Sequence, residues 1–226
     1  MNEVDWTEIV GAANADIRGI IRAQRVKAEI DDELGRRADT PVEEDFIFAD
    51  AFGHDPREPR RVEINGVEVL VRTLHRRGLN MADVKGADLL YEIAGRKFVL
   101  IQYKRPNGRG SIQRDVQQLR DLVDACPNPC PPASPHLWPT CGSWFAVVGI
   151  DEHTYVRACD AESNFGAAQS RPARTFTNGL SRDTFDELFA RCWIGARTAP
   201  SDLAYTAWSL FNSDNVLFSA VQFGGW

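Results

Sequence analysis

Between Gly86 and Lys104 the chain reads GADLLYEIAGRKFVLIQYK. Two runs rich in apolar residues, 87–93 and 97–104, flank the short segment Ala94-Gly95-Arg96. Runs of this length on either side of a glycine-containing turn are typical of two paired antiparallel strands. The sequence therefore predicts a β-hairpin here, and we place the rest of the chain relative to it.

Three polar side chains of this hairpin are expected to share one face. If the turn centres on Gly95, Asp88 lies directly opposite Gln102, and Lys104 projects from the same face because side chains alternate along a strand. A register shifted by one residue would separate them. The opposite face would carry an apolar set suited to packing under helices: Leu89, Tyr91, Ile93, Val99, Ile101 and Tyr103.

Periodicity and turn signals predict further elements on both sides of the hairpin. Before it we expect one or two helices over residues 6–35, a short helix over 41–52, and strands 60–64 and 67–71 joined at Asn65-Gly66. After it we expect a helix capped near Ser111 that runs to about Ala125, a buried strand over 144–150, a return strand at 155–158 and a helix over 182–193. Strands and helices therefore alternate along the middle of the chain.

Composition indicates a soluble globular chain. The 226 residues are 43% hydrophobic and 26% charged, within the usual globular range. No window approaches the roughly 18 consecutive apolar residues that a membrane span requires. The N-terminal residues lack the apolar core of a signal peptide, so we expect a cytoplasmic, reducing location and no membrane partner.

Charge is distributed unevenly along the chain. The net charge of −6 and the pI of about 5.3 argue against a protein that coats nucleic acid by bulk electrostatics. From Arg57 to Arg120, however, roughly 14 of the 26 basic residues occur together with about 7 acidic ones. This basic island is either an ordinary solvated face or a surface that binds a polyanion.

The motif formed by Asp88 and Gln102-Tyr103-Lys104 resembles that of the PD-(D/E)xK restriction-endonuclease-like superfamily. The resemblance covers roughly residues 41–160 and follows the family's order of helix, three strands, helix and strand. It implies an α/β fold whose mixed central sheet is flanked by helices. A helical segment (residues 1–40) would precede this core, and an α+β extension (residues 161–226) would pack on it.

The resemblance also implies a metal-dependent endonuclease that hydrolyses phosphodiester bonds of DNA. Asp88 and Gln102 would bind Mg²⁺ or Mn²⁺ through oxygen atoms, and the Lys104 ammonium would stabilise negative charge that develops at the phosphate. The family usually has Asp or Glu where this chain has Gln102, so the motif is closer to the D…QxK variant of some restriction and antiphage nucleases. Glu44 fits the family's additional Glu on the first core helix better than Glu43 does.

In a nuclease, the basic island would supply the residues that bind nucleic acid: Arg76, Arg77, Lys85, Arg105, Arg109 and Arg114. Gln117 or Gln118, on the helix after the motif, would contact DNA or a metal-bound water, although a solvent-facing glutamine is the favoured interpretation. We expect DNA as the substrate, with RNA as an alternative. A protein partner or a second copy of the chain would supply specificity, within a prokaryotic restriction or antiphage defence system.

Other functions fit the same residues. A catalytically silent module that binds nucleic acid or protein is compatible with the neutral Gln102 and the acidic overall balance. A repair or junction-resolving nuclease is a third candidate. The plainest interpretation is that Asp88 and Lys104 form a surface ion pair across the hairpin, which would contribute well under about 1 kcal/mol.

Four cysteines suggest a second metal site. Three of them, Cys126, Cys130 and Cys141, lie in the proline-rich loop 126–142, and Cys159 follows the predicted return strand. If that strand turns about residue 152, Cys159 approaches Cys141. Four thiolates fit a tetrahedral structural Zn²⁺ site. The alternative is a set of separate buried thiols, since a disulfide is not expected in a reducing compartment.

Overall fold

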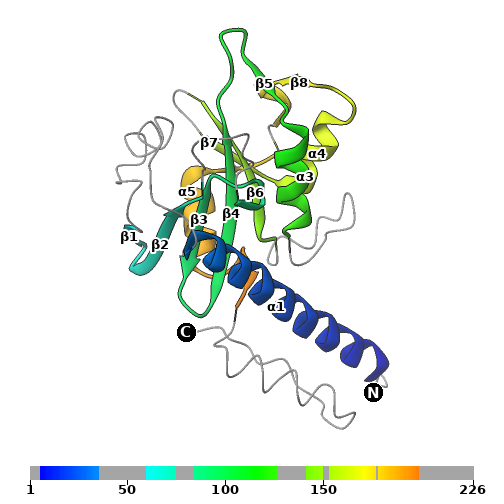
Figure 1. Cartoon of the computed structure of the whole chain (residues 1–226), viewed down its shortest axis with the longest axis vertical. Coiled ribbons are helices and arrows are strands. Elements are labelled where there is room, and N and C mark those ends of the chain that lie inside the picture. Colours follow the sequence, from blue (N-terminus) through cyan, green and yellow to red (C-terminus); the bar gives the residue numbers. More distant parts are fainter. Residues whose placement is uncertain are drawn as a thin grey trace, which may run out of the picture.

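The computed structural model describes residues 6–35, 60–74, 84–126, 141–149, 153–176 and 178–198 of the chain. Within these ranges the fold is α/β, with an eight-stranded mixed sheet and four α-helices around it (Figure 1). No helix in these ranges is both long and apolar enough to cross a membrane. The helix predicted over residues 41–52 lies outside the described residues.

The described elements alternate between strands and helices, as the sequence pattern predicted. In chain order they are α1 (Trp6–Gly35), β1 (Arg60–Ile64), β2 (Val67–Thr73), the 3₁₀ helix η1 (Val84–Gly86), β3 (Leu89–Ile93), β4 (Lys97–Lys104), β5 (Ser111–Gln113), α3 (Val116–Asp124), β6 (Ser143–Val148), β7 (His153–Arg157), α4 (Ala158–Phe165), β8 (Ser170–Pro172), the 3₁₀ helix η3 (Ala173–Phe176), β9 (Leu180–Ser181), α5 (Arg182–Ala190) and β10 (Ala196–Arg197).

The strands of the main sheet follow the order β1-β2-β3-β4-β6-β7-β9, and β10 pairs with the start of β4. The neighbours β4 and β6 run parallel, with Leu100 opposite Ser143 and Lys104 opposite Val147, whereas the other pairs are antiparallel. A parallel pair needs a crossover connection, and α3 lies in this one. Because β9 and β10 follow residue 160, the described part of the predicted extension contributes strands to the same sheet.

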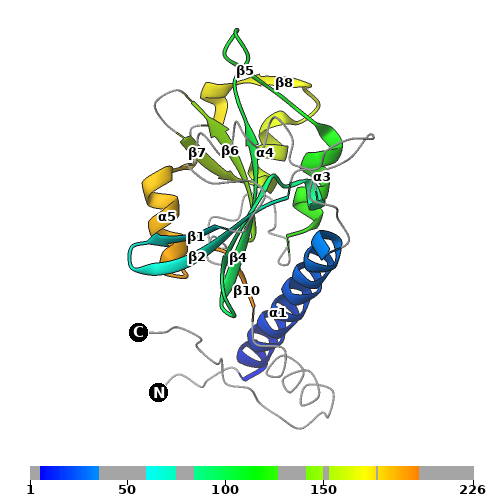
Figure 2. The same cartoon turned by 60° about the vertical axis from the view of Figure 1, so that its left-hand side comes forward.

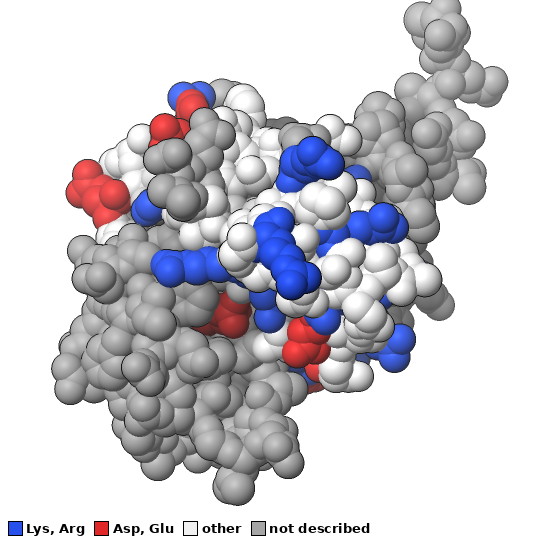
Figure 3. Space-filling view, turned by 90° about the horizontal axis from the view of Figure 1, so that it is seen from above, with Lys and Arg blue, Asp and Glu red and all other residues white. Residues whose placement is uncertain are grey.

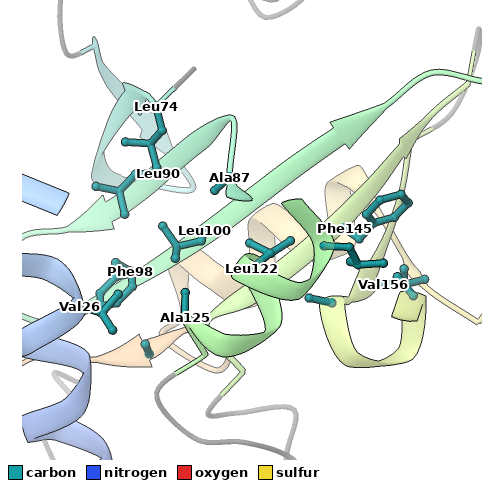
Figure 4. Close-up of a cluster of buried hydrophobic side chains, with 14 of the residues drawn as sticks. Val26, Leu74, Ala87, Leu90, Phe98, Leu100, Leu122, Ala125, Phe145 and Val156 are labelled. Atoms are coloured by element: carbon teal, nitrogen blue, oxygen red, sulfur yellow. The ribbon is translucent and has the colours of Figure 1, made fainter. Parts of the chain in front are cut away.

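Both faces of the sheet are buried. α1, α3 and α4 cover one face (Figure 2), where Leu100 packs in one cluster with Val26 of α1 and Leu122 of α3 (Figure 4). α5 covers the other face, where apolar strand residues meet Phe185 and Phe189. Burial on both faces explains why β4 and β6 are nearly continuous apolar runs.

The central hairpin has the predicted register. Leu89 pairs with Ile101 and Ile93 pairs with Lys97, so the turn centres on Gly95. All six residues predicted for the apolar face are buried in the cluster that α5 covers. Strand β3 begins at Leu89, slightly later than predicted, because the residues just before it belong to η1 and the turn that follows it.

Three further predictions are confirmed. Residues 6–35 form one continuous helix, α1. Asn65 and Gly66 join β1 to β2 with φ angles of 50° and 77°, as expected of the turn that an Asn-Gly pair favours between antiparallel strands. The buried strand β6 is followed by the antiparallel return strand β7, which pairs Trp144 with Arg157.

The helix predicted from Ser111 begins later, and this prediction was wrong. Ser111–Gln113 form strand β5, which pairs with β8 instead of starting a helix. Asp115 is the N-cap of α3, and its side chain accepts a hydrogen bond from the backbone N–H of Gln118 at 3.0 Å. The partner strand β8 lies far along the sequence, so its pairing overrides the local capping signal at Ser111.

Gly86 is the point at which η1 packs against α3. Its φ is 69°, and a Cβ atom there would lie 1.9 Å from the carbonyl oxygen of Gln118 and 2.8 Å from the backbone nitrogen of Leu122. Only glycine leaves room for the helix backbone at this distance. The contact therefore fixes the distance between α3 and the segment that leads into β3. Gly86 precedes Asp88 by two residues.

Replacing Gly86 with alanine should destabilise the protein. The left-handed backbone costs about 1–2 kcal/mol for a residue with a Cβ atom, and the clash with α3 adds about 1–3 kcal/mol. Gly95→Ala is the matched control, because Gly95 has a φ of 66° but no atom within 4 Å of its added Cβ. Urea unfolding should show a larger loss for Gly86→Ala, and equal losses would contradict the role given to this contact.

Candidate functional site

Asp88 is anchored to the strand that carries the other two motif residues. It is 6% exposed and directly precedes β3. Its backbone N–H donates to the carbonyl of Ile101 at 2.9 Å, and its carboxylate oxygen Oδ2 accepts from the backbone N–H of Tyr103 at 2.5 Å. The register of the hairpin, continued by one residue, places Asp88 opposite Gln102 as predicted.

Gln102 and Lys104 meet on a single atom of α3. The side chain of Gln102 is fully buried, and its Nε2 donates to Oε1 of Gln118 at 2.8 Å. The ammonium of Lys104 donates to the same Oε1 at 2.7 Å. Alternation along β4 brings the two side chains to one face, and α3 supplies their common acceptor.

The contact with Lys104 determines how both amides are oriented. An ammonium group can only donate hydrogen bonds, so the Gln118 atom that it contacts is the oxygen. That oxygen in turn requires the NH₂ group of Gln102 to face Gln118. The carbonyl oxygen Oε1 of Gln102 therefore points elsewhere, and among the described residues it is buried without a hydrogen-bond partner. A buried acceptor left in this state costs about 1–3 kcal/mol unless a ligand satisfies it.

Gln118 is the site residue that sequence reasoning missed. A solvent-facing glutamine was the favoured interpretation, whereas Gln118 is half-buried between Gln102 and Lys104. The signal was present in the sequence, because the spacing of four residues between Gln118 and Leu122 does not depend on where the helix starts. Gln118 lies one turn before the buried Leu122 and thus on the inward side of α3.

The predicted nucleic-acid contacts lie in different surroundings. Arg105 and Arg109 are exposed. Lys85 contacts Glu29 of α1. Arg114 was predicted to bind nucleic acid, but its guanidinium donates to the carbonyl of Gly166 at 2.5 Å and is 11% exposed, so it ties the start of α3 to α4. Arg76, Arg77 and Glu44 lie outside the described residues.

The described cysteines of the predicted zinc site lie on different elements. The return strand pairs Trp144 with Arg157 and ends there, so Cys159 lies in α4. Cys126 and Cys141 are buried in the cluster that α5 covers. In the described ranges no group of three or more His, Cys, Asp or Glu residues is arranged to hold a metal ion. Cys130 lies outside these ranges, and structural Zn²⁺ stays a prediction.

A second polar feature occupies the opposite face of the sheet. A pocket of about 440 Å³ lies between the β1–β2 hairpin and α5, and its lining includes Tyr91, Arg182 and Asp186. Tyr103 connects this region to the motif, because its hydroxyl lies 3.2 Å from that of Tyr155 and its side chain is buried in the same cluster as Tyr91. Burial raises the pKa of Tyr91 to about 12, so this hydroxyl is neutral at ordinary pH.

Asp186 should make the stability of the protein depend on pH. Burial raises its pKa from 3.8 to about 6, against the opposing effect of Arg182. The folded state therefore binds a proton more tightly than the unfolded state does, and stability is lost as the pH rises from about 4 through 6. Asp186→Asn should be more stable than the wild type at pH 7, with an advantage that vanishes near pH 4. Urea unfolding across this range tests it, and a constant difference would contradict it.

Comparison with known proteins adds no family to this description. No protein-family model matches the chain, and neither a curated protein nor a solved structure matches it. The resemblance to the PD-(D/E)xK superfamily through Asp88, Gln102 and Lys104 stays a prediction. We therefore argue function from the contacts of these residues.

Proposed function

We propose that this protein is a metal-dependent nuclease that hydrolyses phosphodiester bonds of DNA, with a restriction-endonuclease-like core. The observation that carries the proposal is the buried, unpartnered Oε1 of Gln102, held on the same face of one hairpin as Lys104 and opposite Asp88. A carboxylate oxygen and an amide oxygen can bind Mg²⁺, and an ammonium group can stabilise the negative charge that develops on the phosphate during hydrolysis.

The order of the described elements supports such a core. The antiparallel strands β2, β3 and β4 are followed by α3, which leads to β6, and β6 runs parallel to β4. The predicted first core helix, residues 41–52, lies outside the described residues. The site residues lie where β4 nears its carboxyl end beside β6. In open α/β sheets, ligands commonly bind in the crevice outside the carboxyl ends of the strands.

Asp88 and Gln102 are the residues that would hold the metal ion. Mg²⁺ accepts hard oxygen ligands and retains several waters, so one carboxylate and one amide oxygen are sufficient protein ligands. The bound ion would neutralise phosphate charge and lower the pKa of a coordinated water. The hydrogen bond from Tyr103 N–H holds the Asp88 carboxylate in place, and Gln118 directs the Gln102 oxygen away from α3.

Lys104 is the residue that would stabilise the reacting phosphate. Its ammonium is fixed by Gln118 at 2.7 Å and remains half-exposed, so it can reach a substrate without leaving its partner. An ammonium retains two further donors in this arrangement. Donors that are already positioned stabilise developing negative charge without reorganisation during the reaction.

One observation favours a second candidate, a module that binds nucleic acid without cleaving it. The second ligand position carries the neutral Gln102, and the described residues contain no cluster of carboxylates around Asp88. A less anionic site binds Mg²⁺ more weakly. A role in antiphage defence, a protein partner and a homodimer are further proposals that rest on the resemblance alone.

Cleavage assays test the proposal directly. Plasmid, linear duplex and single-stranded DNA, and RNA, would be incubated with the protein in Mg²⁺, Mn²⁺ or EDTA. We expect metal-dependent cleavage of DNA that Asp88→Ala and Lys104→Ala each lower by about 100-fold or more. Arg61→Ala, which removes an exposed cation on the β1–β2 hairpin, should cleave like the wild type. Equal residual cleavage by the wild type and both site variants would reject the nuclease.

Gln118 should act as a positioning residue for both Gln102 and Lys104. Gln118→Ala is expected to reduce cleavage and to raise the Mg²⁺ concentration needed for half-maximal activity, each by about tenfold, as for other groups that orient metal ligands. Gln117→Ala is the matched control, because Gln117 is exposed and bonds Asp121 on its own helix. An unchanged Mg²⁺ requirement in Gln118→Ala would contradict this role.

A further inference from the structure

A projecting arm begins directly after the last residue of the site. Here "the arm" means residues 105–113 together with β8 and η3. Strand β5 pairs with β8 in a small separate sheet, with Ser111 opposite Pro172. The backbone N–H of Ala173 donates to the carbonyl of Gly110 at 2.9 Å, which fixes η3 beside the tip of the loop. In Figure 1 the arm extends beyond the main sheet at the end where β4 stops.

The arm carries charge of one sign. It contains four basic residues and no acidic residue, and Lys104 and Arg114 flank its first segment, although the whole chain has a net charge of −6. Figure 3 looks onto this end of the molecule, and Lys and Arg side chains gather across its described surface. A local field of this kind attracts polyanions even when the protein as a whole is acidic.

Three arginines of the arm are available to a ligand. Arg114 and Arg171 bond the carbonyls of Gly166 and Phe165, so they hold the arm against α4. Arg105, Arg109 and Arg174 are exposed, and no carboxylate among the described residues forms an ion pair with them. Arg109 and Arg174 are the chain neighbours of Gly110 and Ala173, whose backbones are hydrogen-bonded, so the two segments that carry these arginines meet despite their separation in sequence.

From these contacts we infer that the arm holds the phosphate backbone of double-stranded DNA next to the site. The choice of DNA rests on the proposed nuclease function. Surfaces that bind single strands combine positive charge with exposed aromatic rings on which bases stack. The large hydrophobic side chain exposed in the described residues is Trp193, which follows α5 and is not in the arm. The arm therefore offers cations to phosphates and no platform for bases.

The length of the arm limits the distance between the phosphates that it would bind and the site at Lys104. Arg109 follows Lys104 by five residues, so its Cα lies at most roughly 17 Å away along the chain. Adjacent phosphates of one DNA strand are separated by about 3.4 Å along the helix axis. The arm would therefore contact phosphates within about half a helical turn of the bond that is cleaved. Contact at the backbone positions DNA without selecting a sequence.

Binding in EDTA tests this inference separately from cleavage. The probe is a fluorescein-labelled 30-base-pair duplex, and anisotropy is measured from low to moderate salt. We expect Arg109→Ala/Arg174→Ala to bind about tenfold more weakly than the wild type and to lower the slope of log affinity against log salt by about 1.8, because each lost phosphate contact contributes about 0.9. The double lysine variant, which keeps both charges, should retain most of the binding.

Arg96→Ala is the matched control, because Arg96 is exposed in the turn before β4, at the opposite end of that strand. It should bind like the wild type. Equal weakening by the control and the arm variant, or no binding of duplex by the wild type, would overturn the inference. Tighter, arm-dependent binding of a single strand or of RNA would overturn the choice of duplex. If the wild type binds duplex through the arm but does not cleave it, the inference about DNA binding by the arm stands and the proposed nuclease function is rejected.

Discussion

The packing of Gly86 against the backbone of α3 is the contact on which the rest of the site depends. It brings the helix close enough for Gln118 to reach across to β4 and to accept hydrogen bonds from both Gln102 and Lys104. A larger residue at position 86 would push the helix away, and Lys104 would lose its fixed partner. The geometry of the polar residues is thus set by a close approach between two backbones rather than by the polar residues themselves.

Strand β4 serves both faces of the sheet. One face presents Gln102 and Lys104 beside α3, and the other carries Tyr103 into the cluster under α5. Its parallel pairing with β6 requires a crossover, and that crossover supplies both α3 and the first strand of the arm, β5. A single topological requirement therefore gathers the carbonyl oxygen of Gln102, its orienting helix and the exposed cations at one end of the molecule.

Local patterns were sufficient to predict the two hairpins, because Asn65-Gly66 and Gly95 mark their turns and alternation sets which side chains share a face. The convergence of Gln102 and Lys104 followed from that register. What local patterns missed depends on contacts between distant segments. The pairing of β5 with β8 moved the start of the helix, the hydrogen bonds of Gln118 join α3 to a strand that precedes it, and the bond from Arg114 to Gly166 draws its side chain toward α4.

Tyr103 contributes two unrelated contacts through different parts of one residue. Its backbone N–H holds the Asp88 carboxylate, while its hydroxyl belongs to the tyrosine group on the far face. Every residue except proline has that N–H. Substitution of the side chain can therefore remodel the region around the far pocket and leave the Asp88 anchor intact. The two faces of this strand can therefore change separately, because the backbone of Tyr103 makes the contact with Asp88 and its side chain makes the contacts on the far face.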